Sequence, residues 1–261
     1  MTWQARLNPI LTFTFAFVLD IVVANSMSQT TDEDHHLEYG SRILHGQPDR
    51  FGPFMDIKTP VTALNALPRL IGAYFDPNLY RRTRKFFVSR TMARFPSVLA
   101  AMGIIFFIYR FADELYGRRA ALSAALLAAL SPNLIAHGTL ATTDGYFALG
   151  ALAALYFLRR YLLNPTAANA WISGLAFAAA QIMKPLAAFL YPMAAVFLVT
   201  AGVHYRFAKI TTKRLAVYAL AAALSCIVVL NLAYLFDRTF APLSSYRFET
   251  SFFRSLQESL P

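Results

Sequence analysis

Long apolar blocks with almost no charge alternate with short basic loops along this chain. The blocks lie at residues 7–27, 95–112, 120–136, 143–158, 170–203 and 215–236. Most are close to the roughly 20 apolar residues that a helix needs to cross a hydrocarbon core of about 30 Å. Helices satisfy all their own backbone polar groups, so they are the structures that such blocks form in lipid. The pattern predicts an all-α polytopic membrane protein.

The block at 170–203 is too long for a single crossing. As one helix it would measure about 51 Å at 1.5 Å per residue. Its only charge is Lys184, and Pro185 follows directly. Because proline cannot donate the helical hydrogen bond, we expect a break there. The chain is then a single transmembrane domain with about seven spans, at residues 7–27, 95–112, 120–136, 143–158, 170–183, 185–203 and 215–236.

The polar segment at 28–94 forms a long first outer loop in this scheme, and 237–261 forms an outer tail. Within the loop, Pro60 to Phe75 is moderately apolar and interrupted by Pro and Gly, which indicates a short re-entrant or interfacial piece. Asn78 to Phe95 mixes cations with aromatic residues and predicts a helix in the head-group plane. Its cations are Arg81, Arg82, Arg84, Lys85, Arg90 and Arg94.

Composition supports the membrane class and excludes others. The chain is 57% hydrophobic and 15% charged, whereas soluble domains average about 45–50% apolar and about 25% charged. Collagen, coiled coil, disordered tail and disulfide scaffold are excluded as well. A single cysteine, Cys226, reports nothing about redox compartment. The net charge of +10 fits span topology and lipid head groups, so we expect membrane lipids and not nucleic acid as partners.

The distribution of cations predicts which way the chain faces. With the N-terminus inside, the short inner loops carry nine Lys and Arg, and the short outer loops carry only Lys184. The positive-inside rule counts short loops, so this orientation is favoured over its inverse, although 28–94 itself contains ten cations. We expect an integral protein of the cell (inner) membrane with its active-site loops outside. In either orientation the loops at 30–36 and 137–144 emerge on the same side.

An acidic cluster follows the first span. Asp32, Glu33 and Asp34 are adjacent, and His36 comes shortly after. Three neighbouring carboxylates repel one another, so a cation or a proton must compensate. One interpretation is a general base that deprotonates an acceptor hydroxyl or amine. A divalent metal held by Asp32, Glu33 and His36 is a second, although no compact metal signature is present. The third is a helix start capped by Thr31 or Asp32.

Four more residues in or beside the spans could take part in chemistry. Asp144 is at the start of the fourth span. It is either an acid that caps the helix or a second acid on the side of the membrane where Asp32 lies. Lys184 must reach head groups, a carboxylate or a phosphate. Asp20 is similarly costly inside a span and could pair with a cation of a neighbouring span. His137 is more often a satisfied polar residue than a ligand.

Several motifs occur in an order that resembles glycosyltransferase family 39. This family includes the protein O-mannosyltransferases and the lipid A aminoarabinose transferases. The likeness extends from about residue 8 to 236. The motifs are Asp32-Glu33-x-x-His36, the run 55–61 before Ala66-Leu67-Pro68, Arg94-Phe95-Pro96, Leu115-Tyr116-Gly117-Arg118, Ser131-Pro132-Asn133 running into Thr142-Thr143-Asp144, and Ile182-Met183-Lys184-Pro185.

The resemblance implies a GT-C fold and a known type of reaction. Such enzymes move a sugar from a polyprenyl-phosphate donor to a protein or a lipid/glycan acceptor, with inversion at the anomeric carbon. Asp32 would be the general base and Glu33 would support it. The remaining candidates would contact the substrate or its phosphate: Arg94 and Lys184 would neutralise the leaving phosphate, Asp144 would order the site, and His36 would contribute to binding.

Two departures from the family pattern qualify these expectations. His36 and Lys58 stand where relatives vary, which leaves the acceptor open. Members of the family are usually much longer, so we expect a truncated or N-terminal portion. The alternatives to an active enzyme are a truncated non-catalytic relative or a membrane transporter. No cofactor is required by the sequence, and a divalent metal is compatible with it.

Overall fold

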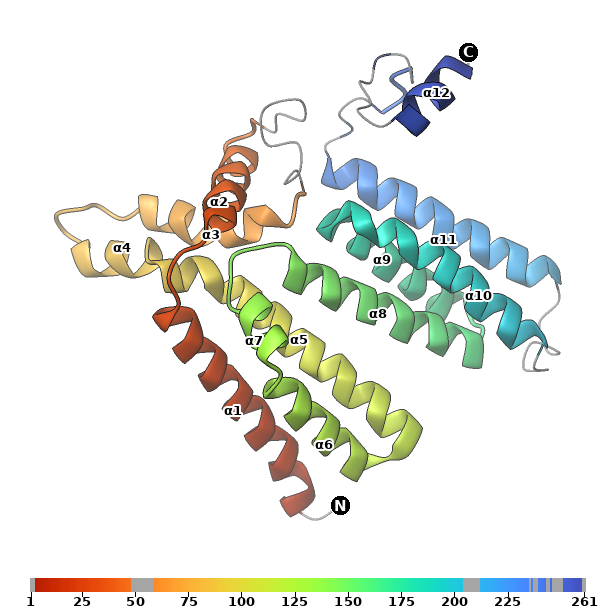
Figure 1. The fold of residues 1–261 in the computed structure, drawn as a ribbon, viewed down its shortest axis with the longest axis horizontal. Helices are drawn as coiled ribbons and strands as arrows, with labels where there is room; N and C mark the ends of the chain where they lie inside the picture. The colour runs from red at the N-terminus through yellow and green to blue at the C-terminus, as the bar shows by residue number, and fades with distance from the viewer. Residues whose placement is uncertain are drawn as a thin grey trace.

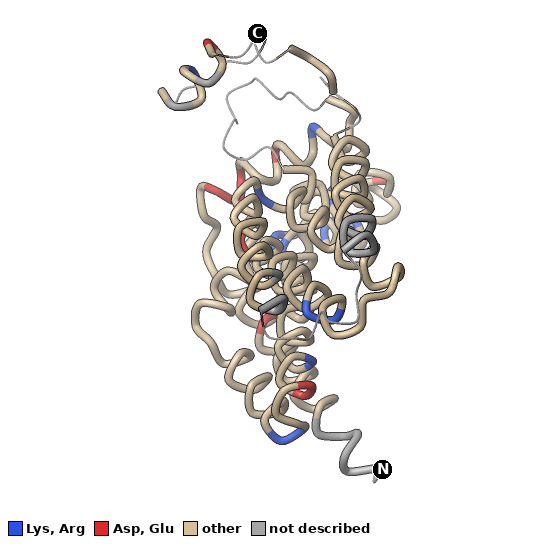
Figure 2. Tube along the Cα trace, turned by 90° about the vertical axis from the view of Figure 1, so that its right-hand side faces the viewer, with Lys and Arg blue, Asp and Glu red and all other residues tan. Residues whose placement is uncertain are grey.

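The computed structural model describes residues 3–47, 59–203, 212–234, 236, 239–242, 245 and 251–259. Every regular element in these ranges is a helix (Figure 1). Most of the trace carries neither acidic nor basic residues, and the charges come in short, separated patches (Figure 2). The predicted all-α membrane class is confirmed. Residues 55–58 of one family-like motif, Lys58 included, lie outside the described ranges.

Three of the described helices are long and apolar enough to cross a membrane. They are α1 (Trp3–Ser26), α5 (Arg90–Tyr116) and α8 (Asp144–Leu163). The predicted third span is divided into α6 (Arg118–Ala129) and α7 (Pro132–Gly138), which are bent by 62° and make a fourth candidate if they act as one span. The bend follows from Pro132, which cannot continue the hydrogen bonding of the preceding helix but suits a first helical position.

The later apolar blocks form shorter elements. These are α9 (Ala167–Met183), the 3₁₀ helix η2 (Pro185–Phe189), α10 (Leu190–Val203) and α11 (Thr212–Ala233). Helix α9 ends at the predicted break, where Lys184 has extended backbone and Pro185 opens η2. A total of seven spans remains a prediction, because by length and composition the described helices give three or four.

Small residues bring the helices close together. A Cβ added to Gly150 on α8 would lie 2.9 Å from the Cα of Ala180 on α9, and one added to Gly174 would lie 2.7 Å from the Cα of Ala222 on α11. Backbones that approach this closely gain van der Waals contact. This contact matters in a membrane, because apolar lipid tails give no hydrophobic driving force for helix association. Helices α8, α9 and α11 therefore pack as one group, and α1, α5 and α6 form another around Ala16, Ile105 and Ala125.

The long outer loop forms helices at one end of the bundle: α2 (Thr31–Leu44), α3 (Thr62–Ala73) and α4 (Arg81–Phe87) (Figure 1). The single helix expected at 78–95 is wrong. Helix α4 ends at Phe87, and Ser89 starts α5 by accepting a hydrogen bond from the N–H of Met92 at 3.3 Å. Because of this cap, Arg94 belongs to the α5 span and not to an interfacial helix.

Asp20 also differs from expectation. Its side chain lies within α1 and the residue is only 3% exposed, yet no cation of the described residues forms an ion pair with it. The expected partner from a neighbouring span is therefore not found. Cations of the neighbouring span α5 are used elsewhere: Arg94 bonds to the segment after α1, and Arg110 bonds at the far end of the helix.

At that far end, α5 and α8 are joined by a polar cluster around Glu114. Its Oε1 accepts a hydrogen bond from the hydroxyl of Tyr156 at 2.5 Å, and its Oε2 accepts one from Arg159 at 2.6 Å. Arg110 adds a longer contact of 3.2 Å. This cluster ties together the ends of the two spans that are farthest from the outer loop. A separate helix, α12 (Ser251–Ser259), lies near the C-terminus.

Candidate active site

The site begins where α2 follows α1. The N-cap of α2 is Thr30, one residue before Thr31 and two before Asp32, the two expected caps. Oε2 of Glu33 accepts a hydrogen bond from the N–H of Thr30 at 3.1 Å, which closes the helix start as a capping box. The start of α2 is thereby fixed, and Asp32 stands in its first turn with an exposed side chain.

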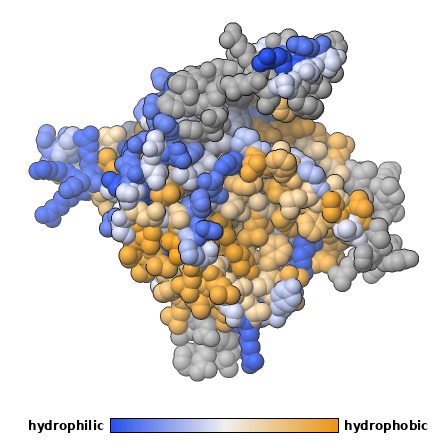
Figure 3. All heavy atoms as spheres, viewed as in Figure 1, coloured by the Kyte–Doolittle hydropathy of each residue, from blue (hydrophilic) through white to orange (hydrophobic). Residues whose placement is uncertain are grey.

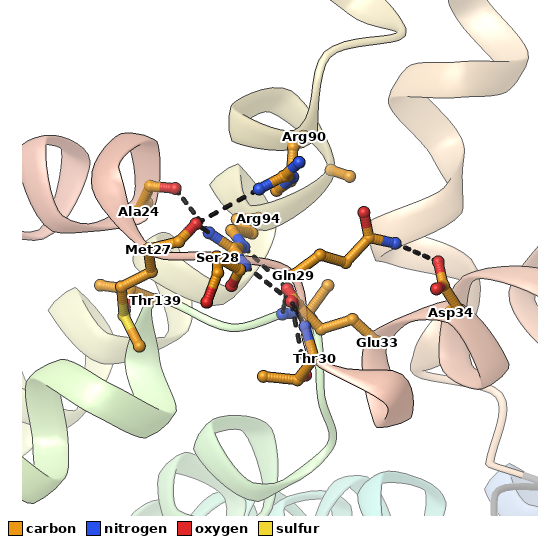
Figure 4. Close-up of polar contacts among 12 residues, drawn as sticks. Ala24, Met27, Ser28, Gln29, Thr30, Glu33, Asp34, Arg90, Arg94 and Thr139 are labelled. Carbon is orange, nitrogen blue, oxygen red and sulfur yellow. Dashed lines mark hydrogen bonds and ion pairs between the residues drawn. The ribbon is translucent and has the colours of Figure 1, made fainter.

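Arg94 is the most deeply buried charged side chain of this region, with 0% exposure. Its Nε donates to Oε1 of Glu33 at 2.7 Å and one terminal nitrogen donates to Oε2 at 2.6 Å. The remaining donors bond to the carbonyls of Ala24 at 2.7 Å, Met27 at 3.0 Å and Ser28 at 2.8 Å (Figure 4). These contacts use all five N–H groups of the guanidinium. Arg94 thus joins the end of α1 to the start of α2.

Glu33 extends this junction to a distant part of the chain. Its Oε1 also accepts a hydrogen bond from the N–H of Ala141 at 2.9 Å, in the connection between α7 and α8. Leu37, Ala93 and Ala141 pack together beside it. The two loops that span parity places on one side of the membrane are therefore in direct contact.

The pKa of Glu33 reflects these contacts. Burial pushes it upward, but hydrogen bonds from Arg94, Ala141 and Thr30 outweigh burial and hold the pKa below its ordinary value. Glu33 is therefore a charged carboxylate with both oxygens occupied. In this arrangement neither Glu33 nor Arg94 has a free group to offer a substrate, and their expected roles toward Asp32 and toward a phosphate remain predictions.

A second set of charged residues is open to solvent. Nζ of Lys184 donates to Oδ1 of Asp144 at 2.5 Å, and Nδ1 of His137 lies 3.6 Å from Oδ2 of the same carboxylate. The side chain of Lys184 is 35% exposed, that of Asp144 44% and that of His137 57%. Asp144 is the first residue of α8, where the helix N-terminus favours a negative charge. His137 therefore lies at the edge of the cluster, and its expected status as a satisfied polar residue and not a ligand stays a prediction.

His36 links this cluster to Asp32. It lies within electrostatic reach of Asp32, Asp144 and Lys184. Burial lowers the pKa of His36 below its ordinary value, and the two nearby carboxylates only partly oppose that effect. His36 is therefore neutral near pH 7. Asp144 from α8 and Lys184 from the end of α9 thus form an ion pair that interacts electrostatically with His36 on α2.

Three buried polar atoms of the same segments have no hydrogen-bond partner within the described residues. They are Nδ1 of His36, Oγ1 of Thr142 and Nε2 of Gln181. Thr142 comes two residues before Asp144, and Gln181 lies one turn before Lys184. Buried polar groups normally find a partner, so these three atoms beside the charged cluster are exceptions to that rule. The sequence pointed to Thr142 only as part of a motif and gave no indication of Gln181, because neutral side chains give no charge signal.

A groove of about 570 Å³ runs from this cluster along the spans. His137 and Asp144 line it at the polar end, and most of the remaining lining is apolar. The apolar lining comes from α5, α6, α7 and α8, and includes Ile104, Ile108, Ala128, Leu134 and Ala148. The arrangement suits a molecule with a long apolar chain and a polar head.

A buried amide holds the outer helices in place around the site. Nδ2 of Asn65 on α3 donates to the carbonyl of Ala93 at 2.7 Å and to Oγ of Ser97 at 2.9 Å, and its Oδ1 accepts from the hydroxyl of Tyr146 at 2.9 Å. This network connects α3 to α5 and α8. Sequence reasoning missed it, since one Asn in a moderately apolar stretch predicts no specific partner.

The metal alternative finds no support in the described residues. No group of three or more His, Cys, Asp and Glu side chains that could hold an ion occurs among them. Glu33, the third ligand of that alternative, is held in a buried ion pair with Arg94 and is therefore not free to bind a metal with Asp32 and His36.

Fold and site together define a polytopic α-helical membrane protein. It carries a polar site where an outer loop meets the ends of its spans, next to a mostly apolar groove of about 570 Å³. The chain belongs to the family described as dolichyl-phosphate-mannose-protein mannosyltransferase, which residues 83–234 match. The matched region includes Arg94, Asp144 and Lys184, whereas Asp32 and His36 precede it.

Membership of this family identifies a mannosyltransferase-like glycosyltransferase that is an integral membrane protein. The expected resemblance is thereby confirmed at the level of the family. The family's description names a dolichyl-phosphate-linked sugar as donor and a protein as acceptor. Comparison with curated proteins and with solved structures gives no match to this chain.

Proposed function

We propose that this protein transfers a sugar from a polyprenyl-phosphate carrier to a nucleophilic group of an acceptor, on the outer side of the cell membrane. The observation that carries the proposal is the position of Asp144, which lines the polar end of an apolar groove and forms an ion pair with Lys184. His36 interacts electrostatically with both of these residues and with Asp32. A lipid-linked sugar has the matching shape, since its chain is apolar and its head carries a phosphate and several hydroxyls.

The donor would lie with its isoprenoid chain in the groove and its phosphate toward Lys184. Lys184 is the one cation that this cluster offers at a partly exposed position among the described residues. A fixed cation stabilises the negative charge that grows on the phosphate as the sugar leaves. The unpartnered atoms of His36, Thr142 and Gln181 would then bond to the head group.

Asp32 would act as the general base. Its carboxylate is exposed in the first turn of α2, close to His36 and free of the ion pair that occupies Glu33. The acceptor oxygen or nitrogen attacks the anomeric carbon as its proton passes to Asp32. The bond between that carbon and the phosphate oxygen breaks, and polyprenyl phosphate departs from the opposite face. A single displacement of this kind inverts the anomeric configuration.

The acceptor side of the site is formed by α2 and the connection between α7 and α8. These segments project beyond the spans, where a polypeptide could reach Asp32 without entering the groove (Figure 1). A protein acceptor agrees with the family's description. A lipid or glycan acceptor would approach from the same side.

The test is sugar transfer in membranes that are supplied with a polyprenyl-phosphate sugar and an acceptor peptide. Asp32→Asn should lower the rate by about 10²–10⁴-fold, the usual contribution of a positioned base. Asp34→Asn is the matched control, because Asp34 is exposed two residues away and bonds to Gln29. Wild-type transfer by Asp32→Asn, or an equal loss in Asp34→Asn, would remove Asp32 from this role.

A further inference from the structure

The α3–α4 hairpin is a compact unit at the edge of the outer loop. Phe75 stacks on Phe87 with ring centres 5.6 Å apart and planes at 11°, and Tyr80 packs edge-on against Phe75 at 5.9 Å. A Cβ added to Gly72 would come within 3.0 Å of the side chains of Phe87 and Val88, so α3 and α4 are in close contact. The aromatic packing therefore holds α4 in a defined place.

The six cations of residues 81–94 fall into two groups. Three are engaged: Arg94 is buried against Glu33, Arg90 donates to the carbonyl of Met27 at 3.4 Å, and Arg84 lies near Asp76. The other three are Arg81, Arg82 and Lys85, whose side chains are exposed on α4. No acidic side chain of the described residues forms an ion pair with any of these three.

Asp76 is the acid that precedes α4 in the chain, and its described contacts are with other groups. The carboxylate of Asp76 accepts hydrogen bonds from the N–H groups of Asn78 at 2.7 Å and Leu79 at 3.0 Å, which stabilises the turn before α4. Arg84 interacts electrostatically with that carboxylate. The exposed face of α4 therefore carries a net positive charge with no internal counterion.

Large apolar side chains surround these cations and face outward. Tyr74 is 84% exposed, Leu79 74% and Phe86 57%. The hydrophilic patch of α4 lies beside the broad apolar surface of the spans (Figure 3), and α4 runs across their ends (Figure 1). Exposed aromatic and aliphatic groups interleaved with cations are typical of helices that lie at the boundary between head groups and acyl chains.

We propose that the α3–α4 hairpin binds the head groups of anionic phospholipids, in the leaflet on the side of the candidate active site. Arg81, Arg82 and Lys85 would contact the lipid phosphates, and Tyr74, Leu79 and Phe86 would enter the region of the acyl chains. Zwitterionic lipids also carry phosphates, but their ammonium groups cancel the charge. An uncompensated cluster of three cations therefore selects for net negative lipids. This proposal is independent of the proposed catalytic function.

The experiment uses the full chain in nanodiscs and a fluorescent reporter, Phe86→Trp, in a background where Trp3 and Trp171 are replaced by Phe. Brominated phosphatidylglycerol or brominated phosphatidylcholine is added at equal mole fraction, and quenching of the reporter by each is compared. We expect stronger quenching by the anionic lipid. One surface cation attracts anionic lipid by about 1 kcal/mol, which corresponds to an enrichment of that lipid around the hairpin of about fivefold. Added salt should reduce this preference for the anionic lipid, because it screens the charges.

Three substitutions, Arg81→Gln, Arg82→Gln and Lys85→Gln, are then combined. The anionic-to-zwitterionic quenching ratio should fall toward one, while total quenching by both lipids persists because the apolar contacts remain. The control Arg118→Gln with Arg119→Gln removes two cations at the start of α6 and should leave the ratio unchanged. Equal quenching by the two lipids in the reporter protein, or an equal fall in the control, would overturn the proposal. Circular dichroism and gel filtration check that each variant is folded.

Discussion

Arg94 and Glu33, 61 positions apart in the chain, form a two-pronged ion pair with nitrogen-to-oxygen distances of 2.7 and 2.6 Å. The pair is buried and joins α5 to the start of α2 (Figure 4). Because Glu33 also accepts the N–H of Ala141, the same carboxylate sets the position of the α7–α8 connection. The geometry makes the pair a support for the site, because it fixes both the start of α2, which carries Asp32, and the connection that leads to Asp144.

Arg94→Met should therefore destabilise the protein as well as reduce its activity. Loss of one partner leaves Glu33 as a buried carboxylate without its cation, which costs roughly 3–5 kcal/mol. Chemical unfolding in detergent micelles measures the change. The double variant Glu33→Met with Arg94→Met should cost less than the single change, since no lone charge remains. Wild-type stability of Arg94→Met with loss of transfer alone would instead favour a direct role on the phosphate.

Lys184 is expected to act on the donor phosphate. Lys184→Met should lower the rate of transfer by about 10²–10³-fold, the cost of losing one group that stabilises transition-state charge. Lys184→Arg keeps the charge and should retain more activity than Lys184→Met. Steady-state kinetics with a purified polyprenyl-phosphate sugar provide the measurement. If the two substitutions reduce the rate equally, charge at this position is not what the reaction uses.

The groove can be tested through the length of the carrier. Ala148 lines it, and Ala148→Phe should fill part of its volume. We expect KM for a long-chain carrier to rise, with little change for a carrier of one or two isoprene units, because a short chain needs less of the groove. Leu127→Phe is the control, since Leu127 is 71% exposed and does not line the groove. Equal effects on long and short carriers would contradict this placement of the chain.

His36 should make stability depend on pH in a defined direction. Its pKa is below the ordinary value of 6.5, so the folded state binds the proton more weakly than the unfolded state. The stability that neutral His36 contributes to the folded state is fully present above about pH 6.5. It is lost as the pH falls from there through the pKa that His36 has in the folded protein. His36→Gln should reduce this loss, as measured by thermal unfolding between pH 8 and 5. An unchanged pH profile in His36→Gln would assign the loss to another group.

The amide network of Asn65 gives a prediction about stability. Tyr146→Phe removes the hydroxyl that donates to Oδ1 of Asn65 and leaves that buried acceptor unpaired. The expected cost is about 1–3 kcal/mol, measured by chemical unfolding. Tyr116→Phe serves as a control, because Tyr116 is 78% exposed and its change should be near neutral. If both variants unfold alike, the network does not stabilise the contact between α3 and α8.

Apolar periodicity alone predicts much of the helical framework. The block at 7–27 corresponds to α1, 95–112 lies within α5 and 143–158 overlaps α8 almost completely. Pro185 marks the end of α9 because a proline constrains its own backbone locally. The division between α6 and α7 and the start of α5 at Ser89 were not predicted, since both depend on turns and caps of one or two residues.

Hydrophobic length and motif order, which can be read along the chain, indicate a helical membrane protein of a glycosyltransferase type. Span parity adds the prediction that the loops at 30–36 and 137–144 share one side. What each charge does depends instead on the folded arrangement. Arg94 and Lys184 both look like isolated cations in apolar surroundings. In the fold, however, every N–H group of the Arg94 side chain is hydrogen-bonded inside the protein, whereas Lys184 is partly exposed beside Asp144. Which groups are occupied depends on contacts between residues far apart in the chain, and no local pattern encodes them.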